Sequence, residues 1–157
     1  MSDRPSMIGG PDGLMALYYQ GGTSGLFDAI DVGGADDDLD VRFCEAVVAA
    51  DPDYVEALAF LGNTYTRRGE HTKGLEIDLR LARLRPRSPR VQYNLACSCA
   101  LTGRREEALA ALRRAVEFGF TDADHMLKDD DLASLRDDPL FKTLVELVRD
   151  TEKDAKA

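Results

Sequence analysis

The sequence predicts an all-α protein: a short α-solenoid of antiparallel helix pairs, closed by a C-terminal capping helix. Two segments repeat one pattern at an offset of 34 residues, the first over residues 55–88 and the second over residues 89–122. Gly69 in the first segment aligns with Gly103 in the second. A fixed period of this length is typical of helix-turn-helix repeats that stack side by side. Leucine and alanine dominate the apolar residues, which favours helix over sheet.

Residues 1–38 form an acidic lead-in with eight glycines. Each glycine inside a helix costs about 1 kcal/mol, so a long helix is not expected there. Two short helices are predicted at Leu14–Tyr19 and Leu26–Ile30, where apolar residues recur at helical spacing. Three consecutive aspartates at 36–38 then suit the positive end of the helix that follows.

Residues 39–52 are predicted to be half a repeat unit, with a helix over Leu39–Ala50. The apolar stripe of this helix is expected to hold Leu39, Phe43, Ala46, Val47 and Ala50. Pro52 ends the helix, because proline cannot continue it and pushes the preceding residue out of helical geometry.

Each complete unit is expected to contain two helices joined by a glycine turn. The predicted helices are Asp53–Arg67, Thr72–Leu84, a third that begins at Pro89 with Ser88 as its cap, and Arg105–Phe118. Gly69 and Gly103 supply the turns, and Pro86 and Gly119 end the second helix of each unit. The residues at the helix crossings are small, namely Gly62, Gly74, Ala96 and Ala108. Close approach of two helices requires such small residues.

Residues 123–150 are predicted to cap the solenoid. Two short helical turns are expected at Asp124–Lys128 and Asp131–Leu135, followed by a final helix over Pro139–Asp150. This helix carries one apolar face, which would cover the open end of the repeat array. Residues 151–157 are charged and are expected to be a frayed tail.

The repeats resemble the tetratricopeptide family. The positions that carry the resemblance are Leu58, Leu61-Gly62, Tyr65, Gly69, Gly74, Leu81 and Pro86 in the first unit, and Leu95-Ala96, Gly103, Ala108, Leu112 and Ala115 in the second. The segment from Tyr93 to Phe141 is also similar to the C-terminal cap of some bacterial tetratricopeptide arrays. The resemblance covers residues 39–147 and implies a right-handed solenoid that binds other proteins. Phe120 stands where the family places a terminating proline, and no regular third unit follows.

Members of this family bind peptides or helices along a concave face lined by the first helix of each unit. The resemblance places the partner-binding residues at Glu56, Asn63, Thr66, Arg90, Tyr93, Asn94 and Cys97. Asn63 and Asn94 occupy the places where chaperone-binding relatives hold a peptide's terminal carboxylate. However, Ala59 stands where those relatives have a lysine, and asparagine at both places is common in the family without that function.

The charge distribution indicates the kind of partner. Residues 67–114 carry a net charge of +7, whereas residues 1–56 carry −10 and residues 115–157 carry −6. A basic core suits an acidic peptide, although solvated arginines on outer helix faces would give the same pattern. The acidic ends disfavour nucleic acid, since they would repel phosphate.

The chain is not predicted to be an enzyme, and neither a cofactor nor a metal site is expected. His71 and His125 are 54 residues apart, and both are expected to be solvated surface side chains. The glycines at 21–25 lack the lysine of a phosphate-binding loop. The aspartates at 36–40 and 129–131 lack the spacing of a calcium-binding loop, and helix capping accounts for them.

The cysteines and the N-terminal residues favour a cytoplasmic location. Cys44, Cys97 and Cys99 are odd in number, and the last two point in different directions from one helix, so buried thiols in a reducing compartment are expected. No apolar signal sequence is visible, and the apolar segment Leu14–Tyr19 is too short to span a membrane.

We therefore predict a non-enzymatic protein-interaction module. Two alternatives remain open on the sequence alone. The first is a small secretion chaperone of the tetratricopeptide class, whose glycine-bearing N-terminal helix is similar to residues 18–30. The second is a self-associating structural subunit, in which a second copy or the chain's own N-terminal segment fills the groove. That segment offers Leu14, Leu17, Tyr18, Leu26 and Phe27.

Overall fold

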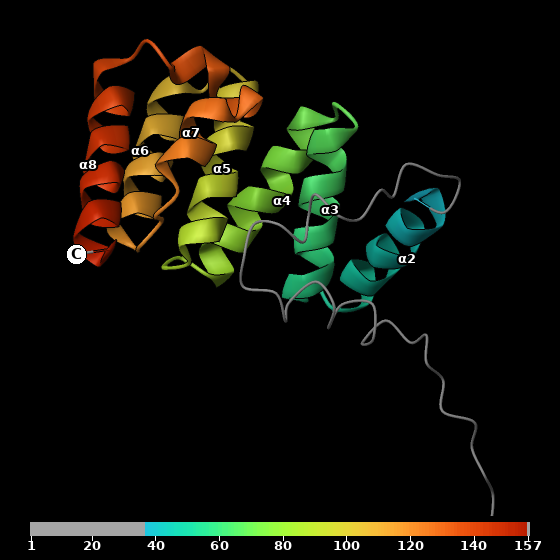
Figure 1. Cartoon of the computed structure of the whole chain (residues 1–157). Coiled ribbons are helices and arrows are strands. Elements are labelled where there is room, and N and C mark those ends of the chain that lie inside the picture. The colour runs from blue at the N-terminus through green and yellow to red at the C-terminus, as the bar shows by residue number, and fades with distance from the viewer. Residues whose placement is uncertain (1–36, 157) are drawn as a thin grey trace, which may run out of the picture. The chain divides into compact units, whose positions relative to one another are not determined.

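The computed structural model describes residues 37–156, and all regular structure in this range is helical. In chain order the helices are α2 (Asp37–Ala50), α3 (Val55–Arg67), α4 (His71–Leu84), α5 (Pro89–Leu101), α6 (Arg105–Glu117), α7 (Ala123–Lys128), the 3₁₀ helix η1 (Asp130–Leu135) and α8 (Pro139–Lys156). Helices α3 to α6 form two successive antiparallel pairs (Figure 1). The predicted all-α solenoid is confirmed. The helices expected within residues 1–36 lie outside the described residues.

The chain divides into two compact units, Met1–Arg42 and Phe43–Ala157. In the second unit, the Tyr65 hydroxyl of α3 donates a 2.6 Å hydrogen bond to the carboxylate of Glu45 in α2. The predicted apolar stripe of α2 is wrong. Phe43 is 45% exposed, whereas the side chain of Cys44 is buried. The buried face of this helix is therefore rotated by about one residue, or roughly 100°, from the face predicted by apolar spacing.

The glycine turns have the predicted positions. Gly69, Gly103 and Gly119 have φ angles of 76°, 75° and 106°, a region that glycine adopts without the steric cost of a Cβ. In each turn the following amide donates back across the end of the helix: Glu70 to Tyr65 at 2.8 Å, Arg104 to Cys99 at 2.8 Å, and Phe120 to Ala115 at 2.9 Å. The same closure of helix ends therefore recurs three times and sets the reversal between successive elements.

Small residues lie where α3 crosses α4, as predicted. A Cβ added at Gly62 would lie 2.9 Å from a carboxylate oxygen of Asp78, and one added at Gly74 would lie 2.7 Å from the Thr66 hydroxyl. Both distances are shorter than normal contacts, so the crossing requires glycine at these places. In the second repeat, Ala96 of α5 and Ala108 of α6 are completely buried.

The C-terminal helix packs against the second repeat and completes its apolar core. Phe141, Leu144, Val145 and Val148 of α8 are buried in one apolar cluster with residues of α5 and α6. Helix α8 begins at the predicted place, where the Leu140 amide donates to Asp138 at 2.8 Å. Arg105 of α6 pairs with the same aspartate at 2.7 Å, which links the start of α8 to the second repeat.

The C-terminal residues differ from the prediction. We expected a frayed tail after Asp150, but α8 continues to Lys156. The carboxylate of Glu152 accepts a 3.1 Å hydrogen bond from the Ala123 amide at the start of α7. Lys153 also pairs with Asp150 at 3.0 Å within the helix. The hydrogen bond between Glu152 and the first amide of α7 holds the C-terminal residues against α7, and this favours the helical form of the tail.

Candidate partner-binding surfaces

The predicted partner-binding residues of the first unit lie on α3. Glu56 and Asn63 are seven residues apart, so they share one face of this helix, and both are partly exposed. Thr66 was predicted to belong to the same row. Its hydroxyl instead lies against Gly74 of α4, at the helix crossing. The first unit thus presents Glu56 and Asn63, while Thr66 serves packing.

The predicted residues of the second unit lie on α5, and the C-terminal cap covers two of them. Tyr93 and Cys97 are only 4% and 6% exposed. The Tyr93 ring stacks on Phe120 with centroids 4.4 Å apart and planes inclined by 7°. Arg90 remains exposed and Asn94 partly exposed. The chain's own cap therefore covers Tyr93 and Cys97, and contact of these two residues with a partner stays a prediction.

The contact between α5 and the cap centres on Asp129. One carboxylate oxygen of Asp129 accepts the Asp131 amide at 3.0 Å and so caps η1. The other oxygen accepts the Tyr93 hydroxyl at 2.9 Å and lies 3.7 Å from the Cys97 sulfur. It is also 3.6 Å from Nε2 of His125. We call these five residues the Asp129 cluster.

Burial and negative charge set the protonation states in the Asp129 cluster. Burial, followed by the nearby Asp129 carboxylate, raises the pKa of the Cys97 thiol well above its ordinary value. Burial also raises the pKa of Tyr93, and the pKa of Asp131 is raised by burial and by Asp129. Cys97 is therefore a protonated thiol at neutral pH. Since the thiolate is the reactive form, Cys97 is a poor nucleophile.

The Asp129 cluster also places three metal-ligating groups together, which the sequence spacing did not predict. Ligand atoms of Cys97, Asp129 and Asp131 lie within 4.8 Å of one another. A metal would require Cys97 to lose its proton and Asp129 to give up hydrogen bonds from Tyr93 and the thiol. The hydrogen bonds from Tyr93 and Cys97 already occupy one oxygen of Asp129, and they join α5 to the cap.

His71 was expected to be a solvated surface side chain, and the structure agrees with this only in part. The residue is only partly exposed, and its Nδ1 is buried with no hydrogen-bond partner among the described residues. His71 lies near enough to Asp131 to lower the pKa of that carboxyl group, against the larger effects that raise it. His125, in contrast, has a side chain that is 45% exposed and agrees with the prediction.

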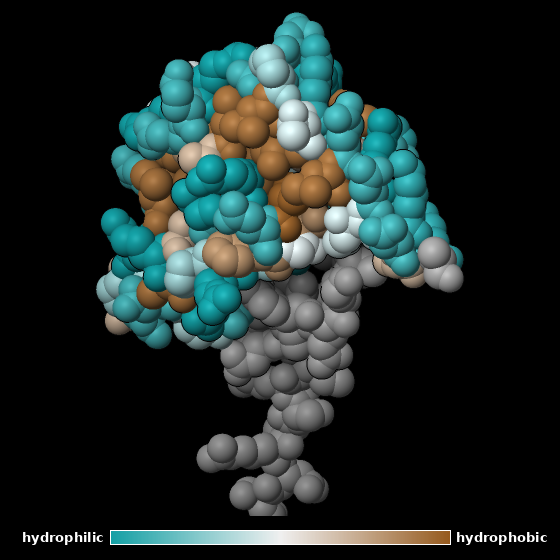
Figure 2. Space-filling view, turned by 90° about the vertical axis from the view of Figure 1, so that its left-hand side faces the viewer, coloured by the Kyte–Doolittle hydropathy of each residue, from teal (hydrophilic) through white to brown (hydrophobic). Residues whose placement is uncertain are grey.

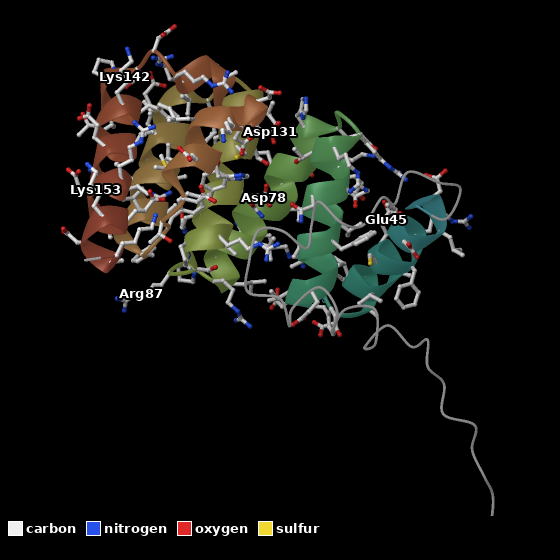
Figure 3. The ribbon with its side chains drawn as sticks, in the orientation of Figure 1. Glu45, Asp78, Arg87, Asp131, Lys142 and Lys153 are labelled. Carbon is white, nitrogen blue, oxygen red and sulfur yellow. The ribbon has the colours of Figure 1, made fainter. Side chains whose placement is uncertain are left out.

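A buried carboxylate joins the two repeat units. Asp78 of α4 is 4% exposed and accepts a 2.5 Å hydrogen bond from the Ser98 hydroxyl of α5 (Figure 3). Burial raises the pKa of Asp78 from 3.8 to about 6, and the bond from Ser98 offsets only part of this. This pair was not predicted from the sequence. The available signal was an aspartate three residues after Leu75, on the face of helix α4 that points inward.

The outer face of α8 carries exposed apolar side chains. Leu140 and Leu147 are 41% and 53% exposed. Figure 2 views this side of the molecule and shows apolar surface bordered by hydrophilic residues. Within residues 37–156, none of the helices combines the length and apolar composition needed to cross a membrane.

Comparison with known proteins supports the fold. The chain is similar to the solved crystal structure of MamA, with a TM-score of 0.62 and 24% sequence identity, over 77% of this chain and 74% of that one. At this identity the likeness concerns the fold alone. Together with the 34-residue period and the paired helices, it shows a tetratricopeptide-like helical repeat fold.

A family comparison adds a second likeness, over the C-terminal part of the chain. Residues 89–156 match the family described as "A/B hydrolase-like, N-terminal domain". The match covers the second repeat unit and the cap, from α5 to the end of α8. No curated protein matches the sequence.

Proposed function

We propose that this chain is a non-enzymatic protein-interaction module that binds a peptide or helix of a partner protein along α3. The observation that carries the proposal is the difference between the two units. The cap covers Tyr93 and Cys97 of α5, whereas Glu56 and Asn63 of α3 remain partly exposed. The proposed groove is therefore short, and its second wall consists of Arg90 and Asn94. An amide such as that of Asn63 can both donate to and accept from a peptide backbone.

The proposal is further supported by the burial of side chains that could otherwise take part in catalysis. Cys97 is buried as a protonated thiol, and Asp78 is buried against Ser98. These groups join helices instead of facing an open site. The proposal places the module in a reducing compartment such as the cytoplasm, because Cys44, Cys97 and Cys99 are all buried free thiols.

A second candidate partner is an α/β-hydrolase domain. This candidate is favoured by the match of residues 89–156 to the family described as "A/B hydrolase-like, N-terminal domain". The exposed Leu140 and Leu147 on α8 lie within the matched segment and offer an apolar contact surface. In this version the partner binds the outer face of α8, and α3 remains free for other ligands.

Affinity capture from the native host tests both versions when it is run with surface variants. The double variant Glu56→Arg and Asn63→Ala alters the α3 row, and Leu147→Glu alters the outer face of α8. Glu106→Arg is the matched control, because it makes the same charge change at an exposed place on α6. A groove-bound partner is lost with the α3 variant alone, with affinity at least about tenfold lower.

The remaining outcomes distinguish the alternatives. Loss of a hydrolase only with Leu147→Glu supports the second candidate. Capture of a secreted protein would favour a secretion chaperone. Light scattering of the purified chain reports self-association, the third possibility. Equal capture of every partner by all three variants would contradict binding through α3 or α8.

A further inference from the structure

The part of the chain from the second half of α4 to the start of α6 is unusually basic. Seven arginines and no acidic residue lie between Asp78 and Glu106. Arg83, Arg85 and Arg87 follow one another at the end of α4 and in the loop after it, and all three are exposed. Arg87 extends from this loop away from the helices (Figure 3). The chain as a whole carries a net charge of −9, so this concentration of positive charge runs against its overall composition.

The loop that carries these arginines is fixed by hydrogen bonds. The Gln92 side chain is only 3% exposed, and its amide nitrogen donates to the Pro86 carbonyl at 2.9 Å. The Ser88 hydroxyl accepts the Val91 amide at 3.3 Å, which caps α5. The Ser88 amide donates to the Arg85 carbonyl at 3.2 Å. The backbone around Arg87 is therefore ordered before any ligand binds, which lowers the entropy cost of binding.

Two guanidinium groups at this end of the molecule are also held in place. Gln92 accepts a 2.9 Å hydrogen bond from Nε of Arg114, so the same buried amide links the loop to α6. The guanidinium carbon of Arg87 lies 5.8 Å from the centre of the Phe118 ring, which directly follows α6. Arg87 and Arg114 therefore both lie beside the last turn of α6. We call Arg83, Arg85, Arg87 and Arg114 the arginine corner.

The arginines of the corner have no carboxylate counter-charge among the residues that the structure describes. Among residues 37–156, none of the four forms an ion pair with a carboxylate. The neighbouring Arg113, in contrast, pairs with Glu117 at 3.5 Å. Fixed guanidinium groups without a carboxylate partner repel one another and are well suited to bind carboxylates in a bidentate geometry.

We infer that the arginine corner binds an acidic segment of a partner protein, with Asp or Glu carboxylates on Arg87 and Arg114. A short acidic peptide fits better than a nucleic acid, since the remainder of the chain is strongly acidic and would repel a long polyanion. This surface lies at the end of α4 and α6 and does not include the Glu56 and Asn63 row on α3. The inference therefore does not depend on the proposed groove.

Fluorescence anisotropy with a short labelled peptide of alternating aspartate and glutamate tests the inference. The full chain is expected to bind the peptide, and Arg87→Glu is expected to weaken binding by at least about tenfold, because it replaces a charged hydrogen-bond donor with a repelling group. Arg113→Glu is the matched control. It makes the same change in net charge one residue from Arg114, on a side chain that is already paired.

Folding and specificity are checked in parallel. Circular dichroism and thermal unfolding should be unchanged for Arg87→Glu, because the side chain is exposed and, within residues 37–156, it interacts with the Phe118 ring at the surface. Arg114→Lys keeps the charge but removes the forked donor, and it is expected to weaken binding less than Arg87→Glu. Equal weakening by Arg113→Glu and Arg87→Glu would overturn the inference, and so would displacement of the peptide by an equal concentration of inorganic phosphate.

Discussion

The buried carboxylate of Asp78 makes the folded protein less stable as pH rises. The side chain lies between α4 and α5, and burial raises its pKa from 3.8 to about 6. The folded state therefore binds this proton more tightly than the unfolded chain does. The stability that this proton binding contributes is complete below the ordinary carboxyl pKa and is lost as pH rises through about 6.

The magnitude follows from the size of the pKa shift. A rise of about two pKa units corresponds to about 3 kcal/mol of unfolding free energy above the raised pKa. Between about pH 5 and about pH 8 the contribution of Asp78 changes by roughly 1–2 kcal/mol. Asp78→Asn keeps the shape and an acceptor for the Ser98 hydroxyl but carries no charge. The variant is therefore expected to be more stable than the parent chain at about pH 8, by up to about 3 kcal/mol, and the difference should shrink toward about pH 5.

Urea unfolding followed by circular dichroism over this pH range measures the effect. The control is Glu76→Gln, which makes the same change in net charge at an exposed position of the same helix. The reasoning is refuted if Asp78→Asn retains the same change in stability between the two pH values as the parent chain. It is also refuted if the asparagine variant is less stable than the parent at the higher pH.

Three further predictions concern packing and the cap. Gly62→Ala should destabilise the chain by about 1–3 kcal/mol in urea unfolding, because its Cβ would lie 2.9 Å from the Asp78 carboxylate. Asp129→Ala should cost about 2 kcal/mol in the same assay, since it removes the cap of η1 and leaves the buried Tyr93 hydroxyl without its acceptor. Leu144→Ala should cost about 2–5 kcal/mol, whereas Leu147→Ala should cost less than about 0.5 kcal/mol, because Leu144 is buried and Leu147 is exposed.

Each of these predictions has a result that contradicts it. An increase in stability for Gly62→Ala, as an unhindered helix position would give, would show that the helix crossing is wider than described. Unchanged stability for Asp129→Ala would mean that the cap does not depend on its hydrogen bonds to α5. Similar losses for the two leucine variants would show that α8 buries a different face.

Much of the fold was predictable because its signals are local. Gly69 and Gly103 reverse the chain through their own backbone conformation, and Ser88 caps the residues that directly follow it. The repeat period then fixed the pairing of the helices, since equivalent positions fall on equivalent faces. For the same reason, the crossing of α3 and α4 at Gly62 and Gly74 was predictable from residue size alone.

The candidate site was less predictable. The repeat period predicts which residues of a unit are exposed only where the neighbouring segments are regular repeats as well. Tyr93 and Cys97 occupy positions that correspond to an open concave face, yet residues 120–135 fold back onto α5 and cover them. Phe120 was recognised as a departure from the repeat, but its stacking on Tyr93 depends on where the irregular cap lies. Periodicity carries no information on the path of an irregular segment.

By itself, the sequence determined the helices, their glycine turns and the charge pattern, because each depends on residues close together in the chain. Only the tertiary structure decided which polar groups are buried. Asp78 meets Ser98 20 residues away, and Tyr93 meets Asp129 36 residues away. The free energy of burying a polar group depends on the partner that satisfies it, and that partner is set by how the helices pack. The tertiary structure thereby buried Tyr93 and Cys97 of α5 and left Glu56 and Asn63 of α3 partly exposed.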